Sequence, residues 1–196
     1  MSHYYSKTQE SDLRITRIQA RLRENDLEFD TASGIFSIGK IDRGSELIIN
    51  KCEVKNNSDV LDLGCGYGAI GISIAKAFPE SKVIMTDINE RAVMIAKRNM
   101  KINRVENVKV FQGDGFEKIN QKFDVILLNP PQSAGKLLCI SLMKKSREFL
   151  KEGSSLQVVM RHRIGGKDIS GKVLHDFRNM DIITRKSGYR IYSFKI

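Results

Sequence analysis

The sequence predicts an α/β fold, in which a doubly wound, mostly parallel sheet of seven strands ends in an antiparallel C-terminal hairpin. From residue 59 onward, short runs rich in β-branched residues alternate with helical patterns, as in sheets that carry helices on both faces. The strand runs are largely apolar without strict alternation, which indicates burial on both faces. Only Lys186-Ser187-Gly188 separates the last two runs, which leaves room for a turn but not for a helix.

The strands and helices follow from these runs in order. The predicted strands cover residues 60–63, 82–86, 108–111, 123–128, 156–160, 181–184 and 190–194. Apolar residues recur at helical spacing over 92–100, with Asn89 as the predicted N-cap, over 138–150, with an end at Gly153, and over 174–177. Strands joined by helices in this way form right-handed βαβ units, so the first five strands are expected to be parallel.

Residues 1–58 are expected to form an N-terminal extension packed on a core domain of residues 59–196, not a second domain. Residues 8–25 are interpreted as a basic amphipathic helix that carries four arginines between Arg14 and Arg23. The runs 27–29 and 35–38, joined by Thr31-Ala32-Ser33-Gly34, are interpreted as a hairpin. Residues 46–53 are interpreted as a helix that leads into the first strand of the sheet.

The composition favours a nucleic-acid partner over a metal site or a membrane segment. Lys and Arg number 33 against 23 Asp and Glu, a net charge of +10, and a positive surface attracts polyanions such as RNA. The three cysteines show no CxxC spacing, and three histidines are too few for a zinc cluster. No secretory signal pattern opens the sequence, and its apolar runs are too short to cross a bilayer. We therefore expect a cytoplasmic protein without a metal; the sequence does not define its oligomeric state.

A glycine-rich turn, Leu-Asp-Leu-Gly-Cys-Gly-Tyr-Gly at residues 61–68, follows directly on the first predicted strand. Glycine tolerates positive φ and lets the backbone approach a ligand closely, as a nucleoside cofactor requires. A helix is expected to begin at Ala69, so its free N–H groups face the same ligand. At the strand tip, Asp62 can approach an ammonium group of that ligand. The residues of this turn that are expected to contact the cofactor are Asp62, Gly64, Cys65, Gly66, Tyr67 and Gly68.

Two further carboxylates follow the next two strands. Asp87 ends the second strand, where it can accept hydrogen bonds from ribose hydroxyls, and Ile88 can pack on an adenine face. Asp114, followed by Gly115, can accept a hydrogen bond from the adenine amino group. These features favour S-adenosylmethionine (SAM) as the cofactor. The glycines and Asp87 also fit the GxGxx[GA] dinucleotide pattern, so an NAD-dependent oxidoreductase is an alternative at this point.

Asn129-Pro130-Pro131 comes directly after the fourth strand, at the edge where open α/β sheets bind ligands. An exocyclic amine or an amide nitrogen has a delocalised lone pair. When two protein oxygens accept hydrogen bonds from its two N–H groups, that pair becomes localised on the nitrogen. The side-chain oxygen of Asn129 and the carbonyl of Pro130 are the predicted acceptors. The prolines fix φ and remove competing donors. Because SAM carries a good leaving group, positioning the nitrogen suffices, and the motif predicts N-methyl transfer.

Together these motifs resemble the methyltransferase small domain family, which contains the small-subunit rRNA guanine-N2 methyltransferases. The resemblance covers residues 34–196. The matching stretches are residues 34–40, 42–45, 61–68, Asp87, 129–131 and 188–190. The resemblance implies a Rossmann-like class I methyltransferase fold, SAM as donor and a base amino nitrogen as acceptor. It also implies that Phe36, Lys40 and Asp42 belong to a segment that folds over the cofactor pocket.

One position departs from the family pattern. Gln132 follows the motif, where many related enzymes carry a Phe or Tyr that stacks on the target base. Phe36, Tyr67 and Tyr189 are the candidate replacements. The rRNA enzymes also often carry a second, degenerate methyltransferase-like domain, which we do not expect here. We therefore expect RNA contacts to come from the core, from the N-terminal extension or from a partner.

The most specific prediction is methylation of guanine N2 in rRNA, either free or in a ribosomal particle. Arg161 and Arg163 belong to a basic cluster after the fifth strand and are expected to contact phosphates. The residues expected to contact the substrate are Phe36, Lys40, Gln132, Arg161, Arg163 and Tyr189. A protein methyltransferase acting on a glutamine amide is the first alternative, because it would use the same two acceptors and needs no stacking aromatic. An NAD-dependent oxidoreductase and a non-catalytic SAM-binding module are the others.

Overall fold

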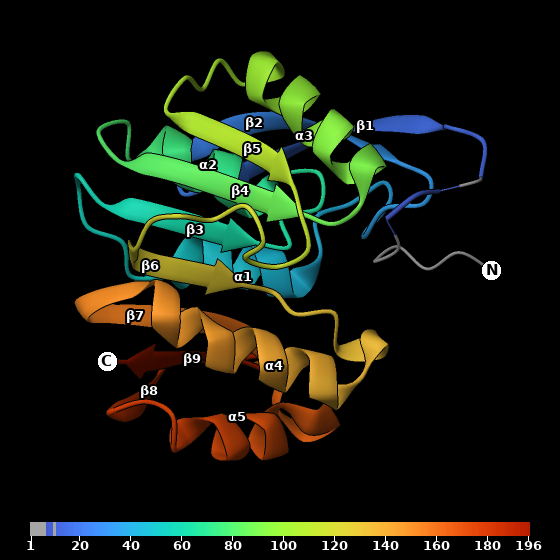
Figure 1. Cartoon of the computed structure of the whole chain (residues 1–196). Helices are drawn as coiled ribbons and strands as arrows, with labels where there is room; N and C mark the ends of the chain where they lie inside the picture. The colour runs from blue at the N-terminus through green and yellow to red at the C-terminus, as the bar shows by residue number, and fades with distance from the viewer. Residues whose placement is uncertain (1–6, 10) are drawn as a thin grey trace.

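The computed structural model describes residues 7–9 and 11–196, and the predicted seven-stranded sheet lies at its centre (Figure 1). The strands are β3 (Asp59–Leu63), β4 (Lys82–Asp87), β5 (Val108–Gln112), β6 (Phe123–Leu128), β7 (Leu150–Arg161), β8 (Asn179–Lys186) and β9 (Tyr189–Lys195). Their order in the sheet is β5-β4-β3-β6-β7-β9-β8. The first five are parallel to one another, whereas β9 runs antiparallel to both β7 and β8. The predicted fold class is therefore confirmed.

Helices cover both faces of this sheet (Figure 1). One face packs against α1 (Arg43–Lys51), α2 (Ala69–Ala77) and α3 (Glu90–Ile102), and the other packs against α4 (Lys136–Ser146) and α5 (Lys167–Leu174). Three short helical turns are η1 (Gln132–Ala134), η2 (Arg147–Phe149) and η3 (His162–Gly166). Asn89 caps α3 as predicted, because its side chain accepts from the first backbone N–H groups of that helix. Within the described ranges, no helix has the length and apolar character needed to cross a lipid bilayer.

The predicted N-terminal helix is wrong, because residues 15–32 form a two-stranded antiparallel hairpin. Its strands are β1 (Ile15–Leu22) and β2 (Asn25–Ala32), and Leu22 pairs with Asn25 across a two-residue turn. Arg23 and Glu24 in that turn have φ of 45° and 64°, which suits a tight hairpin turn. The apolar residues Ile18, Ala20 and Leu22 alternate with polar ones, and this period of two packs one face of β1 on the core. The second predicted hairpin is also wrong, since residues 35–38 form turns and bends.

The helix predicted over 138–150 ends earlier than expected. α4 stops at Ser146, η2 follows, and β7 begins at Leu150, which pairs with Phe123 of β6. Gly153 lies inside β7 with φ of 75°, where the register between β6 and β7 shifts. Glycine at this position accommodates a β-bulge and does not end a helix. Residues 43–51 confirm the predicted helix before the sheet, starting three residues earlier than residue 46.

Asp30 anchors the hairpin to α3. Its carboxylate is 1% exposed and accepts from Arg17 Nε at 2.8 Å and Arg17 Nη2 at 3.2 Å, and it also pairs with Arg98 of α3. The Asn99 side chain bonds both backbone groups of Asp30 and donates to the carbonyl of Tyr67 at 2.8 Å. The hairpin is therefore tied both to α3 and to the glycine-rich turn. The predicted boundary of the extension at residue 58 stays a prediction.

Asp30→Asn is expected to lower the free energy of unfolding by about 2 kcal/mol at pH 7. The hydrogen bonds from Arg17, with the charges of Arg98 and Arg17, hold the pKa of Asp30 below 3.8 against the opposing effect of burial. A lowered pKa stabilises the folded state above the pKa of the unfolded chain, about 3.9, and this contribution disappears as pH falls through the folded-state value. Urea unfolding at pH 7, 5 and 3 should therefore show a parent–variant gap that closes with acid. The exposed Asp26→Asn on the same hairpin is the control, and a gap independent of pH would contradict the prediction.

Candidate active site

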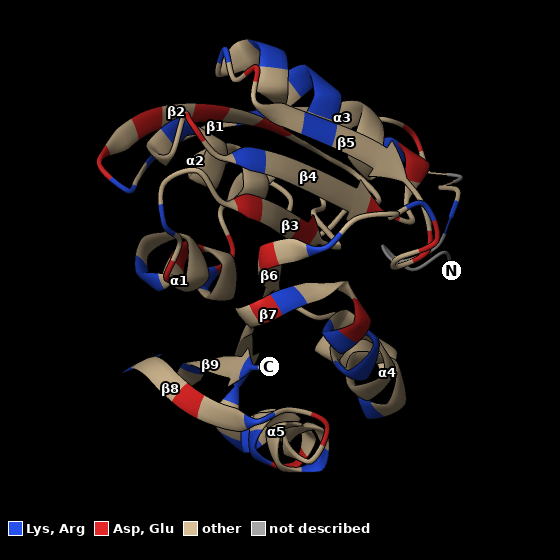
Figure 2. Cartoon of the chain, turned by 60° about the vertical axis from the view of Figure 1, so that its left-hand side comes forward, with Lys and Arg blue, Asp and Glu red and all other residues tan. Residues whose placement is uncertain are grey.

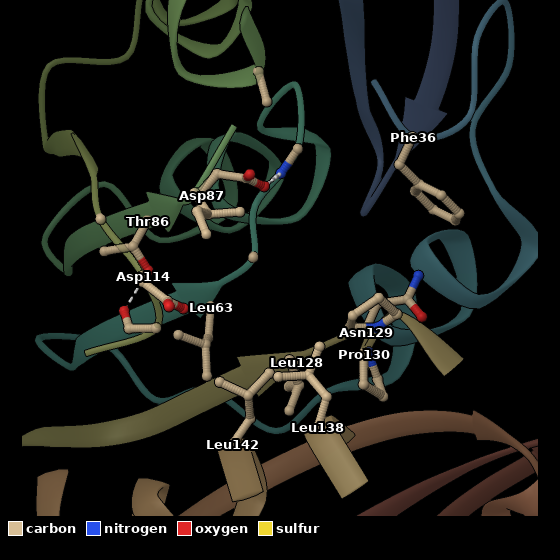
Figure 3. Close-up of a pocket in the computed structure, with 17 residues that line it drawn as sticks. Phe36, Leu63, Thr86, Asp87, Asp114, Leu128, Asn129, Pro130, Leu138 and Leu142 are labelled. Atoms are coloured by element: carbon tan, nitrogen blue, oxygen red, sulfur yellow. Dashed lines mark hydrogen bonds between the residues drawn. The ribbon is translucent and has the colours of Figure 1, made fainter. Parts of the chain in front are cut away.

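A pocket of about 270 Å³ opens at the carboxyl ends of β3, β4 and β6 (Figure 3). Small-molecule sites in proteins start at about this size. The predicted site residues that line it are Phe36, Gly64, Gly66, Asp87, Ile88, Asp114, Gly115, Asn129, Pro130 and Pro131. The sequence interpretation missed several apolar lining residues, among them Leu63, Leu128, Leu138 and Leu142. Because a buried leucine looks the same in sequence whether it faces core or pocket, no local signal distinguishes them.

The glycine-rich turn leaves open space above its backbone. Gly64 and Gly66 have φ of 73° and 56°, and a Cβ atom at either position would meet nothing within 4 Å. The N–H groups of Gly64 and Cys65 donate to the carbonyl of Thr86 at 2.8 and 2.9 Å, which joins the turn to the end of β4. A ligand can therefore lie directly against this turn.

Asp87 is fixed at the tip of β4 by two backbone donors. Its Oδ2 accepts from Gly66 N–H and its Oδ1 from Asn89 N–H, both at 2.8 Å. Burial raises the pKa of Asp87, and these two hydrogen bonds oppose that effect. Each carboxylate oxygen retains a lone pair for a further donor. Asp114, on the same side of the pocket beside Thr86, is exposed and adds a second carboxylate (Figure 3).

Asp62 lies behind the glycine-rich turn and does not line the pocket. Its side chain is fully buried, and Oδ2 accepts from the Gly71 N–H at 2.8 Å, one of the N–H groups that the first turn of a helix leaves unpaired. Oδ1 has no hydrogen-bond partner among the described residues. Burial raises the pKa of this carboxyl to about 7. Its position makes Asp62 a support for the start of α2. The other expected site residues that do not line the pocket are Lys40, Cys65, Tyr67, Gly68, Gln132, Arg161, Arg163 and Tyr189.

The Asn129 amide is held in one orientation. Its Nδ2 donates to Asp42 Oδ2 at 3.1 Å and to Ser45 Oγ at 3.0 Å. An amide nitrogen has two hydrogens, and both are therefore used. The side-chain oxygen is left to accept from a ligand in the pocket. Asp42 Oδ2 also caps α1 through the N–H groups of Gly44 and Ser45, so the first turn of α1 sets the orientation of the amide.

The carbonyl of Pro130 already accepts one hydrogen bond. The N–H of Gln132 donates to it at 2.8 Å, and Pro131 between them has φ of −72° and ψ of 76°, an inverse γ-turn. The prediction that the prolines leave this carbonyl without a competing donor is therefore wrong. A carbonyl oxygen has two lone pairs, so Pro130 can still accept a second donor from the pocket.

Gln132 braces the loop and does not face a ligand. Its Nε2 donates to the Ile164 carbonyl at 3.0 Å, and its Oε1 accepts from the Arg161 N–H at 3.1 Å. A phenylalanine side chain could form neither bond. Among the three candidate aromatics, Tyr67 is buried and donates to the Lys40 carbonyl, and Tyr189 is buried beside Arg161. Phe36 alone lines the pocket, across its mouth from Asn129 (Figure 3).

The residues present fit SAM. The open space above Gly64 and Gly66 accepts a nucleoside close to the backbone, carboxylates at Asp87 and Asp114 can accept from hydroxyl and amino groups, and Ile88 supplies an apolar contact. The pocket lining is mostly apolar with few polar groups, as is usual for cofactor sites. Within the described residues, no three His, Cys, Asp or Glu side chains are grouped in a way that could hold a metal ion.

Comparison with known proteins agrees with this site. Residues 26–193 match the methyltransferase small domain family. The chain is 36% identical to the uncharacterized protein YbxB of Bacillus subtilis over 98% of both chains. It is 29% identical to the ribosomal RNA small subunit methyltransferase C of Pseudomonas entomophila and 32% identical to that of Actinobacillus succinogenes. These matches cover 90% and 82% of this chain but 53% and 48% of the relatives, so the chain spans about half their length.

The fold is shared with solved structures as well. The 16S rRNA N2 methyltransferase RsmC of Thermus thermophilus, solved in complex with AdoMet and guanosine, superposes with a TM-score of 0.83. Sequence identity is 20%, and the match covers 94% of this chain and 51% of that one. The family match extends over most of the chain and includes every residue of the pocket described above. The chain therefore belongs to the methyltransferase small domain family, with S-adenosylmethionine as its cofactor.

Proposed function

We propose that this protein transfers the methyl group of SAM to an exocyclic amino group, namely guanine N2 of small-subunit rRNA, in the cytoplasm. The observation that carries this proposal is the fixed Asn129 amide, whose Nδ2 is engaged by Asp42 and Ser45 and whose oxygen is left for the pocket. Two relatives named as ribosomal RNA small subunit methyltransferase C and the net charge of +10 support RNA as the acceptor.

The residues around the pocket explain how an amino nitrogen is positioned. When bound, SAM supplies an activated methyl group on a sulfonium with a neutral leaving group. The Asn129 side-chain oxygen and the second lone pair of the Pro130 carbonyl accept the two N–H bonds of the acceptor, which directs its lone pair into the pocket. Positioning of this kind can account for much of a rate enhancement. The proton leaves after transfer, so no general base is required of the protein.

A glutamine amide of a protein is the second candidate acceptor. It carries the same delocalised NH₂ group and would use the same two acceptors. The position of Gln132 favours it, because that side chain braces the loop and provides no aromatic surface for a base. Membership of a methyltransferase family removes the support for an NAD-dependent oxidoreductase.

Labelled methyl transfer distinguishes these acceptors. Ribosomal particles and total protein from a strain that lacks the protein would be incubated with methyl-labelled SAM and the purified chain, then digested with ribonuclease or protease. Label released by ribonuclease and recovered as N2-methylguanosine is the expected result. Label that only protease releases would overturn the RNA proposal in favour of the glutamine amide. Label in neither fraction, with SAM binding intact, would contradict both.

Asp42→Ala is expected to reduce kcat about 10-fold with little change in the KM for SAM. The substitution removes one acceptor of the Asn129 Nδ2 group and the N-cap of α1, which costs about 1 kcal/mol of stability. Asp42→Asn should restore part of kcat, because its amide oxygen, with two lone pairs, can still accept from the Asn129 Nδ2 group. Asp42 is thus a positioning residue. If Asp42→Asn were as impaired as Asp42→Ala, the negative charge and not the orientation of the amide would be what matters.

A further inference from the structure

A basic cleft lies beside the pocket, where three segments far apart in sequence meet. Arg43 comes from the start of α1, residues 161–164 from the end of β7 and the turn after it, and residues 185–190 from the end of β8, the hairpin turn and the start of β9. The cleft has a volume of about 650 Å³. Eleven residues line it, of which six are Arg or Lys and none is Asp or Glu. Figure 2 shows Lys and Arg on α5 and on the neighbouring strands β8 and β9.

Five of these cations form no ion pair with any other described residue. They are Arg43, Arg163, Arg185, Lys186 and Arg190. Some cations elsewhere are paired, such as Arg17 and Arg98 with Asp30, and Lys151 with Asp59 and Asp124 at 2.7 and 2.8 Å. The cleft differs in that its described lining brings six cations together without a carboxylate. Gathering like charges without partners disfavours the folded state, and such a concentration of one sign attracts ligands of the other.

His162 reports the positive potential in this cleft. Its pKa is lowered by partial burial and then by the positive charges of Arg190, Lys167, Arg163 and Arg185. Its Nδ1 lies 2.7 Å from the Tyr192 hydroxyl, so the ring is fixed at the cleft wall. An anion bound among these cations would offset their effect on the imidazole.

The cleft is adjacent to Asn129. Tyr189 lines it, and the Arg161 Nε donates to the Tyr189 hydroxyl at 2.9 Å while the guanidinium lies 5.2 Å from the ring centroid. A Cβ atom at Gly44 would lie 3.1 Å from Tyr189 Cε1 and 3.5 Å from Asn129 Nδ2. Gly44 of α1 therefore lies between Tyr189 in the wall of the cleft and the Asn129 amide that is proposed to accept a hydrogen bond from the substrate. Because the Arg161 side chain contacts Tyr189, the other five cations of the cleft are the ones available to a ligand.

We infer that this cleft binds the sugar–phosphate backbone of the RNA strand next to the acceptor base, with Arg43, Arg163, Arg185, Lys186 and Arg190 as the phosphate contacts. The inference rests on the proposed function, since it requires an RNA acceptor at Asn129. Contacts to phosphate fix the register of a strand, and sequence-specific recognition of RNA targets unpaired nucleotides whose bases can be turned out. The cleft supplies the phosphate contacts, and the turned-out base enters the site at Asn129.

The test compares two double variants that each remove two positive charges. Arg185→Gln with Lys186→Gln removes two positive charges from the cleft, and both residues are exposed. Lys97→Gln with Lys101→Gln on the exposed side of α3 is the matched control. Binding of a guanine-containing single-stranded oligoribonucleotide would be measured by fluorescence anisotropy between about 50 and 300 mM salt. Near the middle of this range the Debye length is about 8 Å, so salt screens contacts to phosphate measurably. SAM affinity and Tm verify that both variants fold.

The cleft variant should bind the oligoribonucleotide about 10-fold more weakly at 0.1 M salt, with the slope of log K against log[salt] reduced by about 1.4. The control should change the slope by less than about 0.5. Equal slopes for the cleft variant and the control would overturn the inference while leaving the proposed function standing. If the parent protein bound no RNA and methylated only protein, the proposed function itself would fail. A rise in the pKa of His162, measured by NMR on addition of the oligoribonucleotide, is the expected signature of phosphate in the cleft.

Discussion

Asn129→Ala is expected to reduce methyl transfer by about 10²–10³-fold, the effect typical of removing one preorganised polar group from a reacting centre. The side-chain oxygen lost is the one that the contacts to Asp42 and Ser45 leave for the acceptor nitrogen. Because this oxygen acts on the substrate, SAM affinity should change little, so kcat and kcat/KM should fall together. Single-turnover transfer with labelled SAM, beside calorimetric titration of SAM, measures both quantities.

Asn56→Ala is the matched control for this change, since Asn56 is exposed and forms no hydrogen bond with the described residues through its side chain. Asn129→Asp is a more demanding comparison. It keeps an acceptor oxygen but brings a second carboxylate to the position about 3 Å from Asp42, and like charges at that separation repel strongly. We expect an activity between parent and alanine variant that improves as pH falls. Full turnover by Asn129→Ala would rule out the proposed arrangement of acceptors.

Asp87→Ala is expected to weaken SAM binding about 10- to 100-fold, or about 1.4–2.8 kcal/mol. The carboxylate has two tasks, because it offers lone pairs to the pocket and also accepts the Gly66 and Asn89 N–H groups. Removing it takes away ligand contacts and leaves two backbone donors without their partner, which loosens the turn that lies against the cofactor. Calorimetric titration of SAM, with transfer measured at saturating SAM, separates this loss from a defect in chemistry.

Asp181→Ala serves as the control for the loss of one carboxylate. Asp181 pairs with Lys195 on the edge of the sheet, with 59% and 43% of the two side chains exposed, and such surface pairs contribute about 1 kcal/mol or less. SAM affinity should be unchanged in this variant. If Asp87→Ala bound SAM as tightly as Asp181→Ala, Asp87 would be a structural residue of the turn and the ligand would depend on other acceptors.

The sheet could be predicted because its strands carry their own signal. An apolar run without alternation indicates a strand buried on both faces, and a glycine turn followed by a helix fixes the direction of the chain at the end of β3. β1 carries a weaker signal. Arg17 and Arg21 are four residues apart, a spacing that places them on one face of a helix or of a strand. Only the alternation of polar and apolar residues over all eight positions of β1 distinguishes a strand from a helix. Pairing with β2 settles this in the folded chain.

The site could be predicted only in part, because its most informative contacts are not local. The glycine turn, Asp87 and the motif at Asn129 all follow strands, so their meeting at one edge of the sheet follows from topology. The contacts from Asn129 to Asp42 and Ser45 span more than 80 positions, and no sequence pattern indicates them. The brace formed by Gln132 depends on the path of the turn after β7. Its departure from the family pattern was visible in sequence, but its role was not.

A single atom, Asp42 Oδ2, accepts from Gly44, from Ser45 and from Asn129. The first turn of α1 and the Asn129 amide are therefore held by the same acceptor atom. If that turn frays, two helix N–H groups and one amide hydrogen lose their acceptor together, and Asn129 becomes free to rotate about its last torsion angle. Under the proposed mechanism, fraying at the start of α1 would lower the fraction of molecules whose Asn129 amide is oriented for the reaction.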